Sequence, residues 1–221
     1  MAHTVELKKI EPVTHDTHHL VFDKPDGFAY SPGQGVELNI LKDGWEDEGR
    51  PFTPITLPNE STLEFIIKSY PDHHGMTEQI GKLQADDKLK LSGSFGDISD
   101  QGPGVFIAAG AGVTPMIAIL RKQLHEQGTL DGSTLLFANK AERDIIWRDR
   151  FEAMKGLKTG FVVDEAGAGV PQGRLDRAYL SGFITPDSLC YLCGPPPMMD
   201  AVRTSLKDLG VKDDNIIEEK F

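Results

Sequence analysis

Apolar and polar positions alternate in short runs along the first hundred residues. Six segments follow a period close to two and are separated by Pro-, Gly- and Asp-rich stretches: residues 4–13, 18–24, 35–41, 52–56, 62–70 and 87–94. A period of two is typical of half-buried strands. Several short strands with turn signals between them favour a small antiparallel barrel or sandwich.

The pattern changes after residues 99–104, a stretch that contains two Gly, one Pro and two Asp or Gln positions. Apolar, strand-like runs then alternate with segments of helical period. The runs are 105–110, 134–139, 161–165 and 188–194, and the helical segments are 114–128, 141–156, 174–183 and 195–210. This alternation is typical of a parallel sheet wrapped by helices. We therefore predict a second domain that begins after residue 101.

The composition narrows the class of protein. Of the 221 residues, 39% are hydrophobic and 26% are charged, a profile typical of a soluble globular protein. Asp and Glu outnumber Lys and Arg by 34 to 23, so the net charge of −11 argues against partners such as nucleic acid or an anionic membrane. The N-terminus has no signal-peptide core, and no apolar run approaches the ~20 residues of a spanning helix. We expect a cytoplasmic protein.

Two predicted strand-to-helix turns carry glycine. In "AGAGVTP", residues 109–115, Thr114 is the expected N-cap and Pro115 the first helical residue. In "CGPPPM", residues 193–198, Gly194 permits the turn before a proline opens the helix. Free N–H groups and the helix dipole at such turns favour an anion, as in the pyrophosphate sites of dinucleotide folds. For the first turn the alternative is a capped connection alone, because Pro115 occupies the third glycine position of G-x-G-x-x-G.

The two cysteines, Cys190 and Cys193, are too few for a disulfide framework or a four-cysteine iron–sulfur site. Residues three apart on a strand point to opposite faces. We therefore expect Cys190 to be buried in the sheet and Cys193 to be exposed at the carboxyl tip, rather than a redox pair. The alternative for Cys193 is a small buried residue without a role in a site.

Short histidine clusters raise the question of a metal. His15, His18 and His19 lie in a polar run that we interpret as an edge strand, and His73 and His74 precede Gly75. No cysteine or well-spaced carboxylate accompanies these histidines, so we predict no metal site.

The stretch "RPFTPIT", residues 50–56, holds two prolines between strand-like runs. Proline has no N–H for a ladder, so the stretch indicates either an edge strand or backbone held out towards a ligand. Together with three later motifs it resembles the ferredoxin–NADP reductase superfamily, in particular small flavodoxin/ferredoxin reductase-like proteins and oxygenase reductases. Those motifs are an apolar-Lys run with G-x-T, then G-x-G-x-T-P, then C-G-P-P-P-M, at residues 66–77, 110–115 and 193–198.

The resemblance covers residues 5–221. It implies an N-terminal antiparallel Greek-key β-barrel that binds flavin, residues 1–101, followed by a Rossmann-like parallel α/β domain that binds NAD(P), residues 102–221. The implied function is a flavin-dependent NAD(P)H oxidoreductase that passes hydride to FAD and then electrons to a ferredoxin, a flavodoxin or an oxygenase component. A flavin-binding or electron-transfer subunit without its own turnover is the alternative.

The resemblance also implies roles for residues. Arg50 would meet a flavin phosphate and Phe52, which replaces the commoner Tyr, would pack on the flavin without a hydroxyl to donate. Thr53 would lie beside flavin N5 and Cys193 near nicotinamide C4, and these two are the predicted catalytic residues. The predicted cofactor-binding residues are Arg50, Pro51, Phe52, Thr53, Ile67, Lys68, Ser69, Gly75, Met76, Thr77, Gly110, Gly112, Thr114, Pro115, Cys193, Gly194, Pro195, Met198 and Phe221.

Three alternatives stay open at this point. FMN could replace FAD. NADPH could replace NADH, because Lys140 and Arg143 could meet a 2′-phosphate, although Glu142 and Asp144 beside Arg143 favour NADH. Phe221 could stack over the flavin, as a terminal aromatic does in some relatives, or belong to a disordered terminus.

Overall fold

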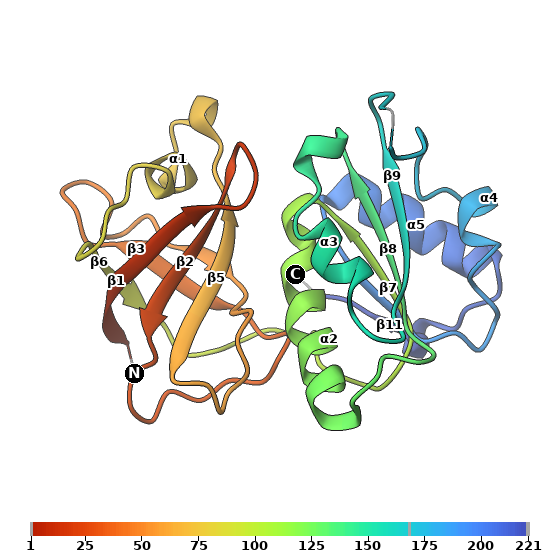
Figure 1. The fold of residues 1–221 in the computed structure, drawn as a ribbon, viewed down its shortest axis with the longest axis horizontal. Coiled ribbons are helices and arrows are strands. Elements are labelled where there is room, and N and C mark those ends of the chain that lie inside the picture. The colour runs from red at the N-terminus through yellow and green to blue at the C-terminus, as the bar shows by residue number, and fades with distance from the viewer. Residues whose placement is uncertain (1, 168, 220–221) are drawn as a thin grey trace.

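The computed structural model describes residues 2–167 and 169–219, which form two sheets that divide the chain (Figure 1). The N-terminal sheet is antiparallel and has the strand order β4-β3-β6-β1-β2-β5. Its strands are β1 (His3–Pro12), β2 (Thr17–Asp23), β3 (Val36–Ile40), β4 (Arg50–Phe52), β5 (Thr62–Lys68) and β6 (Lys88–Leu91). The alternation seen in the sequence is plain in β6, where two leucines are buried and two lysines are exposed.

The segment after β4 brings the two ends of this sheet together. Pro54 forms an isolated bridge to Phe65 on β5, and Ile55 N donates to Glu64 O at 2.8 Å. The stretch "RPFTPIT" therefore pairs with β3 through its first residues and with β5 through its last. The sheet is a nearly closed barrel, and its core includes Phe22 and Phe65.

The C-terminal sheet is parallel, with the order β11-β10-β7-β8-β9. Its strands are β7 (Val105–Ala109), β8 (Thr134–Asn139), β9 (Lys158–Val163), β10 (Cys190–Cys193) and β11 (Ile216–Ile217). The central positions of these strands are mostly apolar because helices cover both faces of the sheet. The predicted fold class, an antiparallel barrel followed by a parallel α/β domain, is confirmed.

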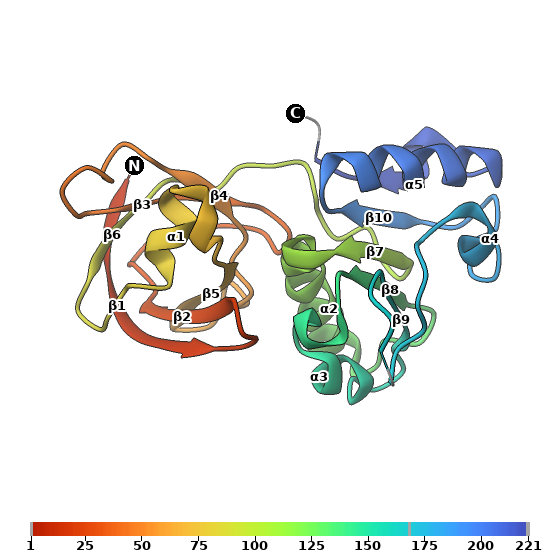
Figure 2. The same ribbon diagram turned by 90° about the horizontal axis from the view of Figure 1, so that it is seen from above.

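Two pairs of helices form the outer layers of the second domain. Helices α2 (Val113–Gln127) and α3 (Arg148–Glu152) cover one face, and α4 (Arg177–Leu180) and α5 (Pro196–Asp208) cover the other (Figure 2). Ile55 and Ile66 of the barrel join the apolar cluster around α2. The α2 face therefore packs towards the barrel, and the carboxyl ends of the strands open onto the space between the domains.

The linker between the sheets runs from the end of β6 to the start of β7, and residue 101, our predicted division, lies within it. Asp100 ties this linker to α2, because its carboxylate accepts from Lys122 Nζ at 2.6 Å and Gln123 Nε2 at 2.7 Å. Among the described residues, no helix combines the length and apolar character needed to cross a bilayer.

Several details of the predicted elements are wrong. The expected helix 141–156 is broken into the 3₁₀ turn η3 (Glu142–Asp144) and the short α3, because Trp147 takes a left-handed φ of +56°. Only four residues of 174–183 become α4. Strand β2, with its histidines, lies between β1 and β5 rather than at an edge, since the barrel uses both of its sides. The remaining short elements are η1 (Pro71–His73), α1 (Met76–Ile80), η2 (Gly110–Gly112) and η4 (Asp213–Asn215).

Candidate active site between the two domains

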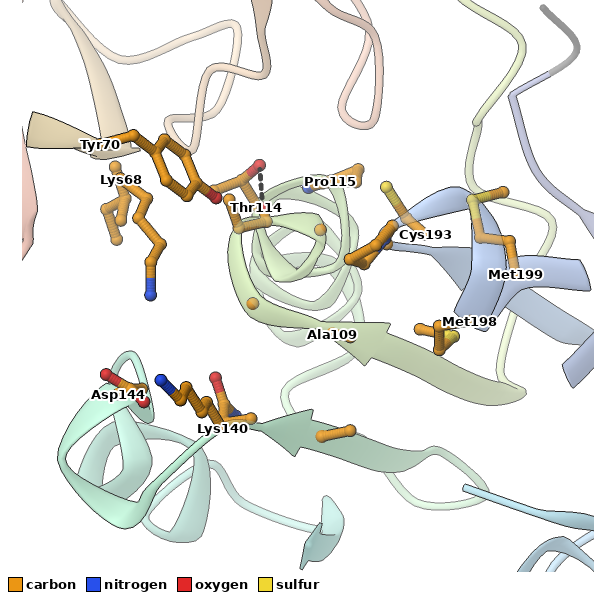
Figure 3. A pocket seen from close by; sticks show the side chains of 18 of the residues that line it. Lys68, Tyr70, Ala109, Thr114, Pro115, Lys140, Asp144, Cys193, Met198 and Met199 are labelled. Carbon is orange, nitrogen blue, oxygen red and sulfur yellow. Dashed lines mark hydrogen bonds between the residues drawn. The ribbon is translucent and has the colours of Figure 1, made fainter. Parts of the chain in front are cut away.

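A cleft of about 1270 Å³ lies between the barrel and the carboxyl ends of the parallel strands. Pockets for a single small ligand usually measure about 300–1,000 Å³, so this cleft has room for more than one such group. Figure 3 shows Lys68 and Tyr70 of the barrel facing the start of α2, with Lys140 and Asp144 on one side and Cys193, Met198 and Met199 on the other.

Most of the predicted site residues line this one cleft, although they come from five separate segments of the chain. They are Pro51, Phe52, Thr53, Ile67, Lys68, Ser69, Thr77, Gly110, Gly112, Thr114, Pro115, Cys193, Gly194, Pro195 and Met198. Their roles stay predictions. Three others, Arg50, Gly75 and Met76, do not line it, and Phe221 lies outside the described residues.

Arg50 and Met76 need separate comment. The Arg50 guanidinium is half exposed and donates to Gly49 O at 2.7 Å and to Glu48 at 3.3 Å, outside the cleft lining. The Met76 side chain is fully buried in the barrel core, because α1 packs its apolar face there. A contact between Met76 and a cofactor is therefore limited to its backbone.

The two glycine turns touch each other. A β-carbon at position 112 would lie 2.4 Å from Cys193 O and 2.7 Å from Gly194 N, so only glycine fits. Gly110 takes a φ of +53°, which glycine adopts at low cost. The pyrophosphate-type turn at β7 and the C-G-P turn at β10 are thus two parts of one surface.

The start of α2 differs from the prediction. The helix begins at Val113 after η2, and its N-cap is Gly112, without a side-chain cap. Thr114 lies inside the helix, and its hydroxyl donates back to Ala111 O at 3.1 Å. The predicted Thr114 cap is therefore wrong. No side chain caps this helix start, although the Val113 N–H already donates to Gly110 O, and the helix dipole favours an anion there.

Cys193 is half-buried rather than exposed, a second correction, because it packs against the apolar cluster around α2. Burial, and secondly the negative charge of Glu219, raise the pKa of the Cys193 thiol to about 12. Cys190 is fully buried on the opposite face, and burial raises its pKa to about 12 as well. Both thiols are neutral at pH 7, so neither is an activated nucleophile.

Ionisable side chains of both domains meet in the cleft wall. Lys68 Nζ lies 2.9 Å from Asp16 Oδ2. Burial opposes ionisation of Asp16, but hydrogen bonds from Lys68 and Thr14 outweigh it and hold its pKa below the usual range. His15, beside Asp16, lies 3.6 Å from Asp144 of the other domain.

These three ionisable groups, His15, Asp16 and Asp144, have possible metal ligand atoms within 4.8 Å of one another. Each carboxylate already has another partner, however: Asp16 holds Lys68, and Asp144 accepts from Ala141 N at 2.9 Å. The cluster is therefore a contact between the two domains.

The sequence did not single out several lining residues. Tyr70 stacks on His73 with ring centroids 5.0 Å apart, and Glu219 accepts from Asp97 N at 3.0 Å. Asn139 forms part of the wall at the end of β8. The sequence could have indicated Asn139 as a lining residue, because it ends a predicted strand and ligands of open α/β sheets bind at strand ends. The contact from Glu219 joins residues more than a hundred positions apart, and no local pattern indicates it.

The residues present fit two nucleotide-like groups. On the α/β side, Gly112 and Gly194 lie so close to neighbouring atoms that a β-carbon would clash, and the start of α2 has no side-chain cap. On the barrel side, Pro51, Phe52 and Thr53 present an aromatic ring and a hydroxyl to the same cleft.

Comparison with known proteins shows what the two parts of the chain are similar to. Residues 4–99 match the family model of the oxidoreductase FAD-binding domain, and residues 106–204 match that of the oxidoreductase NAD-binding domain. The chain is 32% identical to cytochrome b5 reductase 4 of Mus musculus, over 96% of this chain and 45% of the relative. It is 30% identical to the propane 2-monooxygenase reductase component of Mycolicibacterium goodii, over 98% of this chain and 66% of the relative.

The chain thus spans about half to two thirds of the length of these curated relatives. Among solved structures, the CS-b5R domains of human Ncb5or in the NAD+ form are 30% identical and superpose with a TM-score of 0.86, over 100% of this chain and 70% of that one. The ferredoxin reductase in carbazole 1,9a-dioxygenase shares the fold, with a TM-score of 0.86 at 21% identity, over 100% of this chain and 69% of that one.

Barrel, parallel sheet, cleft and family models all agree on one assignment. The chain belongs to the ferredoxin–NADP reductase-like superfamily, with an FAD-binding barrel followed by an NAD-binding α/β domain.

Proposed function

We propose that this chain is an NADH-dependent flavoprotein reductase that delivers electrons to a separate redox protein. One observation carries the proposal. The flavin-type residues 51–53 and 67–69 share a cleft with the nucleotide-type turns at Gly110 and Gly194. A shared cleft is what transfer between two bound groups requires, because the reacting atoms must approach within about 3–3.5 Å.

Bound FAD would accept a hydride and release electrons singly. In our proposal the protein binds the flavin and the nicotinamide dinucleotide and orients them towards each other. The start of α2 holds the pyrophosphate of the dinucleotide, and Thr53 donates a hydrogen bond on the barrel side of the cleft. The half-buried Cys193 shapes the nicotinamide end as a neutral thiol, because burial raises its pKa to about 12.

The charges at the far end of the cleft support NADH over NADPH. Lys140 is paired with Glu165 at 3.6 Å and Arg174 with Asp164 at 3.3 Å, and Asp144 and Asp176 line the cleft together with Arg143. These pairs already engage Lys140 and Arg174, and a 2′-phosphate would also meet the neighbouring carboxylates, which repel it. One relative, at 28% identity, is named NADH-cytochrome b5 reductase 2, from Mycosarcoma maydis.

For the acceptor we propose a one-electron redox protein such as a ferredoxin, a flavodoxin, a small cytochrome or an oxygenase component. Relatives named as cytochrome b5 reductases and as reductase components of oxygenases support this class.

An anaerobic titration tests the proposal. Purified protein should carry a flavin spectrum, NADH should bleach it within one equivalent, and NADPH should do so more slowly. A ferredoxin or cytochrome b5 should then be reduced in the presence of excess NADH. A protein that binds flavin but stays oxidised with both nucleotides would contradict the proposal and favour a subunit without turnover. A protein that cannot be reconstituted with flavin would contradict both.

A further inference from the structure

Arg121 of α2 ties this helix to the barrel. Its Nη1 donates to Ile55 O at 2.6 Å, and its Nη2 donates to Glu60 Oε1 at 2.8 Å. The guanidinium thus binds a main-chain carbonyl and a carboxylate of the other domain at the same time, which suits its planar set of donors. Figure 1 shows α2 as the helix of the α/β domain that lies next to the barrel. Neither Arg121 nor Glu60 lines the cleft, so the pair lies outside the site itself.

The barrel side of this contact is firmly held. Ile55 N donates to Glu64 O at 2.8 Å, and the buried Tyr30 hydroxyl donates to Thr56 O at 3.0 Å. The same short segment presents Thr53 to the cleft, only two residues before the carbonyl that the arginine binds. A helix fixed at this carbonyl is therefore fixed against the flavin-type side of the cleft.

The start of α2 carries the other half of the site. The helix begins at Val113, directly after the Gly110 turn, and Arg121 lies about two helical turns further along. At 1.5 Å per residue the separation is about 12 Å, so a rotation of α2 by about 5° around the arginine would move the helix start by about 1 Å. A misplacement of about 1 Å between reacting groups can lower a rate about a hundredfold.

The apolar contact between the domains does not fix this angle by itself. Ile55 and Ile66 of the barrel pack in the cluster around α2, but hydrophobic burial is non-directional. Hydrogen bonds depend on distance and angle, so two bonds to two held acceptors restrict the orientation of the helix. The side chains of Arg121 and Glu60 are 27% and 35% exposed, and solvent screens their ionic attraction. The pair therefore contributes through its geometry more than through its charge.

The other polar contacts between the domains that we compare do not reach α2. His15 lies 3.6 Å from Asp144, which is longer than a hydrogen bond. Asp97 N donates to Glu219, which follows the last strand of the parallel sheet. Asp100 does bind α2, but it belongs to the linker and not to the barrel. The polar hold of α2 on the barrel thus rests on the arginine.

We infer that Arg121 is a positioning residue for hydride transfer, which fixes α2 against the barrel segment of Thr53 and so keeps the two halves of the cleft aligned. The inference rests on the proposed function and adds to it a residue outside the cleft lining. Each domain binds its own group, whereas alignment needs both domains. Arg121 should therefore affect the rate of transfer far more than the affinity for the nucleotide.

The variant Arg121→Met tests this, because methionine keeps much of the apolar stem and removes every donor. In stopped-flow reduction at saturating NADH, we expect a rate about 10–100-fold lower. The Kd of NAD+ from titration calorimetry should stay within about twofold of the wild-type value. Arg121→Lys should recover part of the rate, since an ammonium group can donate to Ile55 O or to Glu60 but lacks the planar fork.

A second readout does not depend on turnover. Spin labels at Lys90→Cys on β6 and Lys155→Cys after α3 report the distance between the domains, and both positions are exposed. The native Cys190 and Cys193 are buried or half-buried, and burial raises the pKa of both thiols to about 12, so they should take little label. In pulsed dipolar spectroscopy of the nucleotide-free protein, Arg121→Met should broaden the distribution of distances.

Arg148→Met is the matched control. Arg148 is 30% exposed and also binds a carboxylate, that of Glu142, and a main-chain carbonyl, that of Gly169. All three residues belong to the α/β domain, and none of them lines the cleft. The melting temperature should fall, while the rate at saturating NADH and the distances between the labels stay unchanged.

A milder variant guards against loss of the fold. If Arg121→Met does not fold, Glu60→Gln provides the same readouts, because the amide keeps the shape of the side chain and removes only the charge that strengthens the bond to Arg121. We expect its rate of reduction to be about threefold lower than that of the wild type.

The outcomes separate the inference from the proposed function. An unchanged saturated rate in Arg121→Met with a lower melting temperature would mean that the arginine only stabilises the domain contact, and the inference would be wrong. Weaker NAD+ binding at an unchanged saturated rate would refute it as well. An unchanged distance distribution would refute the positioning role whether or not the flavin is reduced. Wild-type protein that neither nucleotide reduces would refute the proposed function, and the role of Arg121 in hydride transfer with it.

Discussion

Gly112 and Cys193 meet across the two strand-to-helix turns, and a β-carbon on Gly112 would lie 2.4 Å from the Cys193 carbonyl oxygen. The contact joins β7 to β10 where both strands end. It holds the helix start at α2 beside the C-G-P turn, so the position of one nucleotide-binding segment depends on the other.

The variant Gly112→Ala should therefore damage stability and binding together. The methyl group cannot fit against backbone atoms without a shift of the turn, and overpacking of this kind typically costs about 1–3 kcal/mol. We expect a lower free energy of unfolding in urea and weaker NAD+ binding. Gly93→Ala is the control, because no atom lies within 4 Å of its added β-carbon. If both variants had the same free energy of unfolding and the same affinity for NAD+, the turn would have to shift at no cost, and the prediction would be wrong.

Thr53→Val should slow reduction of the flavin without loss of the flavin. Thr53 lines the cleft, and in the proposed function its hydroxyl donates one hydrogen bond to the flavin. Loss of such a bond costs about 1.5–3 kcal/mol, which corresponds to a rate about 10–100-fold lower. Stopped-flow reduction by NADH measures this, and Thr53→Ser should keep most of the rate. A Thr53→Val protein reduced at the wild-type rate would contradict the assigned role.

Cys193 should react as a neutral thiol. Burial raises its pKa to about 12, so the thiolate is scarce below pH 9. Alkylation by iodoacetamide at pH 7.5 should be at least about tenfold slower than that of a free thiol. Mass spectrometry follows the reaction, with Cys193→Ser as the unlabelled control. The rate of flavin reduction should be flat from pH 6 to 9, and a step near pH 8 that disappears in Cys193→Ser would contradict the neutral thiol.

Asp100→Asn should loosen the linker in a pH-dependent way. Burial disfavours the charged form, but hydrogen bonds from Lys122 and Gln123 dominate and lower the pKa of Asp100. A depressed pKa stabilises the fold above the unfolded-state pKa, and this contribution is lost as the pH falls through the folded-state pKa.

The expected cost of Asp100→Asn is therefore about 1–2 kcal/mol at pH 6. The difference in the free energy of unfolding between wild type and variant should shrink below about pH 4, where the carboxyl group titrates in the unfolded chain. Urea unfolding at several pH values measures this difference. A difference that grows in acid would mean that the Asp100 carboxylate does not stabilise the linker.

Local patterns in the sequence were enough to predict most of the strands and the fold class. The period of two marked the barrel strands, and strand–helix alternation marked the parallel sheet. The sequence does not show which strands pair with one another. For this reason β2 was interpreted as an edge strand, although β1 and β5 flank it in the sheet. The helix expected at 141–156 failed for a local reason: Trp147 takes a positive φ that its sequence neighbours do not signal.

The sequence by itself determined the residue types of the site, because glycine turns, a helix start and the R-P-F-T stretch are local features of the chain. Only the tertiary structure decided which side chains face one another. It placed Lys68 against Asp16, turned Arg50 to Glu48 outside the cleft lining, buried Met76 and left the amide of Asn139 without a partner in the described chain. Most such contacts depend on how strands, helices and loops pack within a domain, and this packing joins residues whose separation along the chain carries no periodic signal.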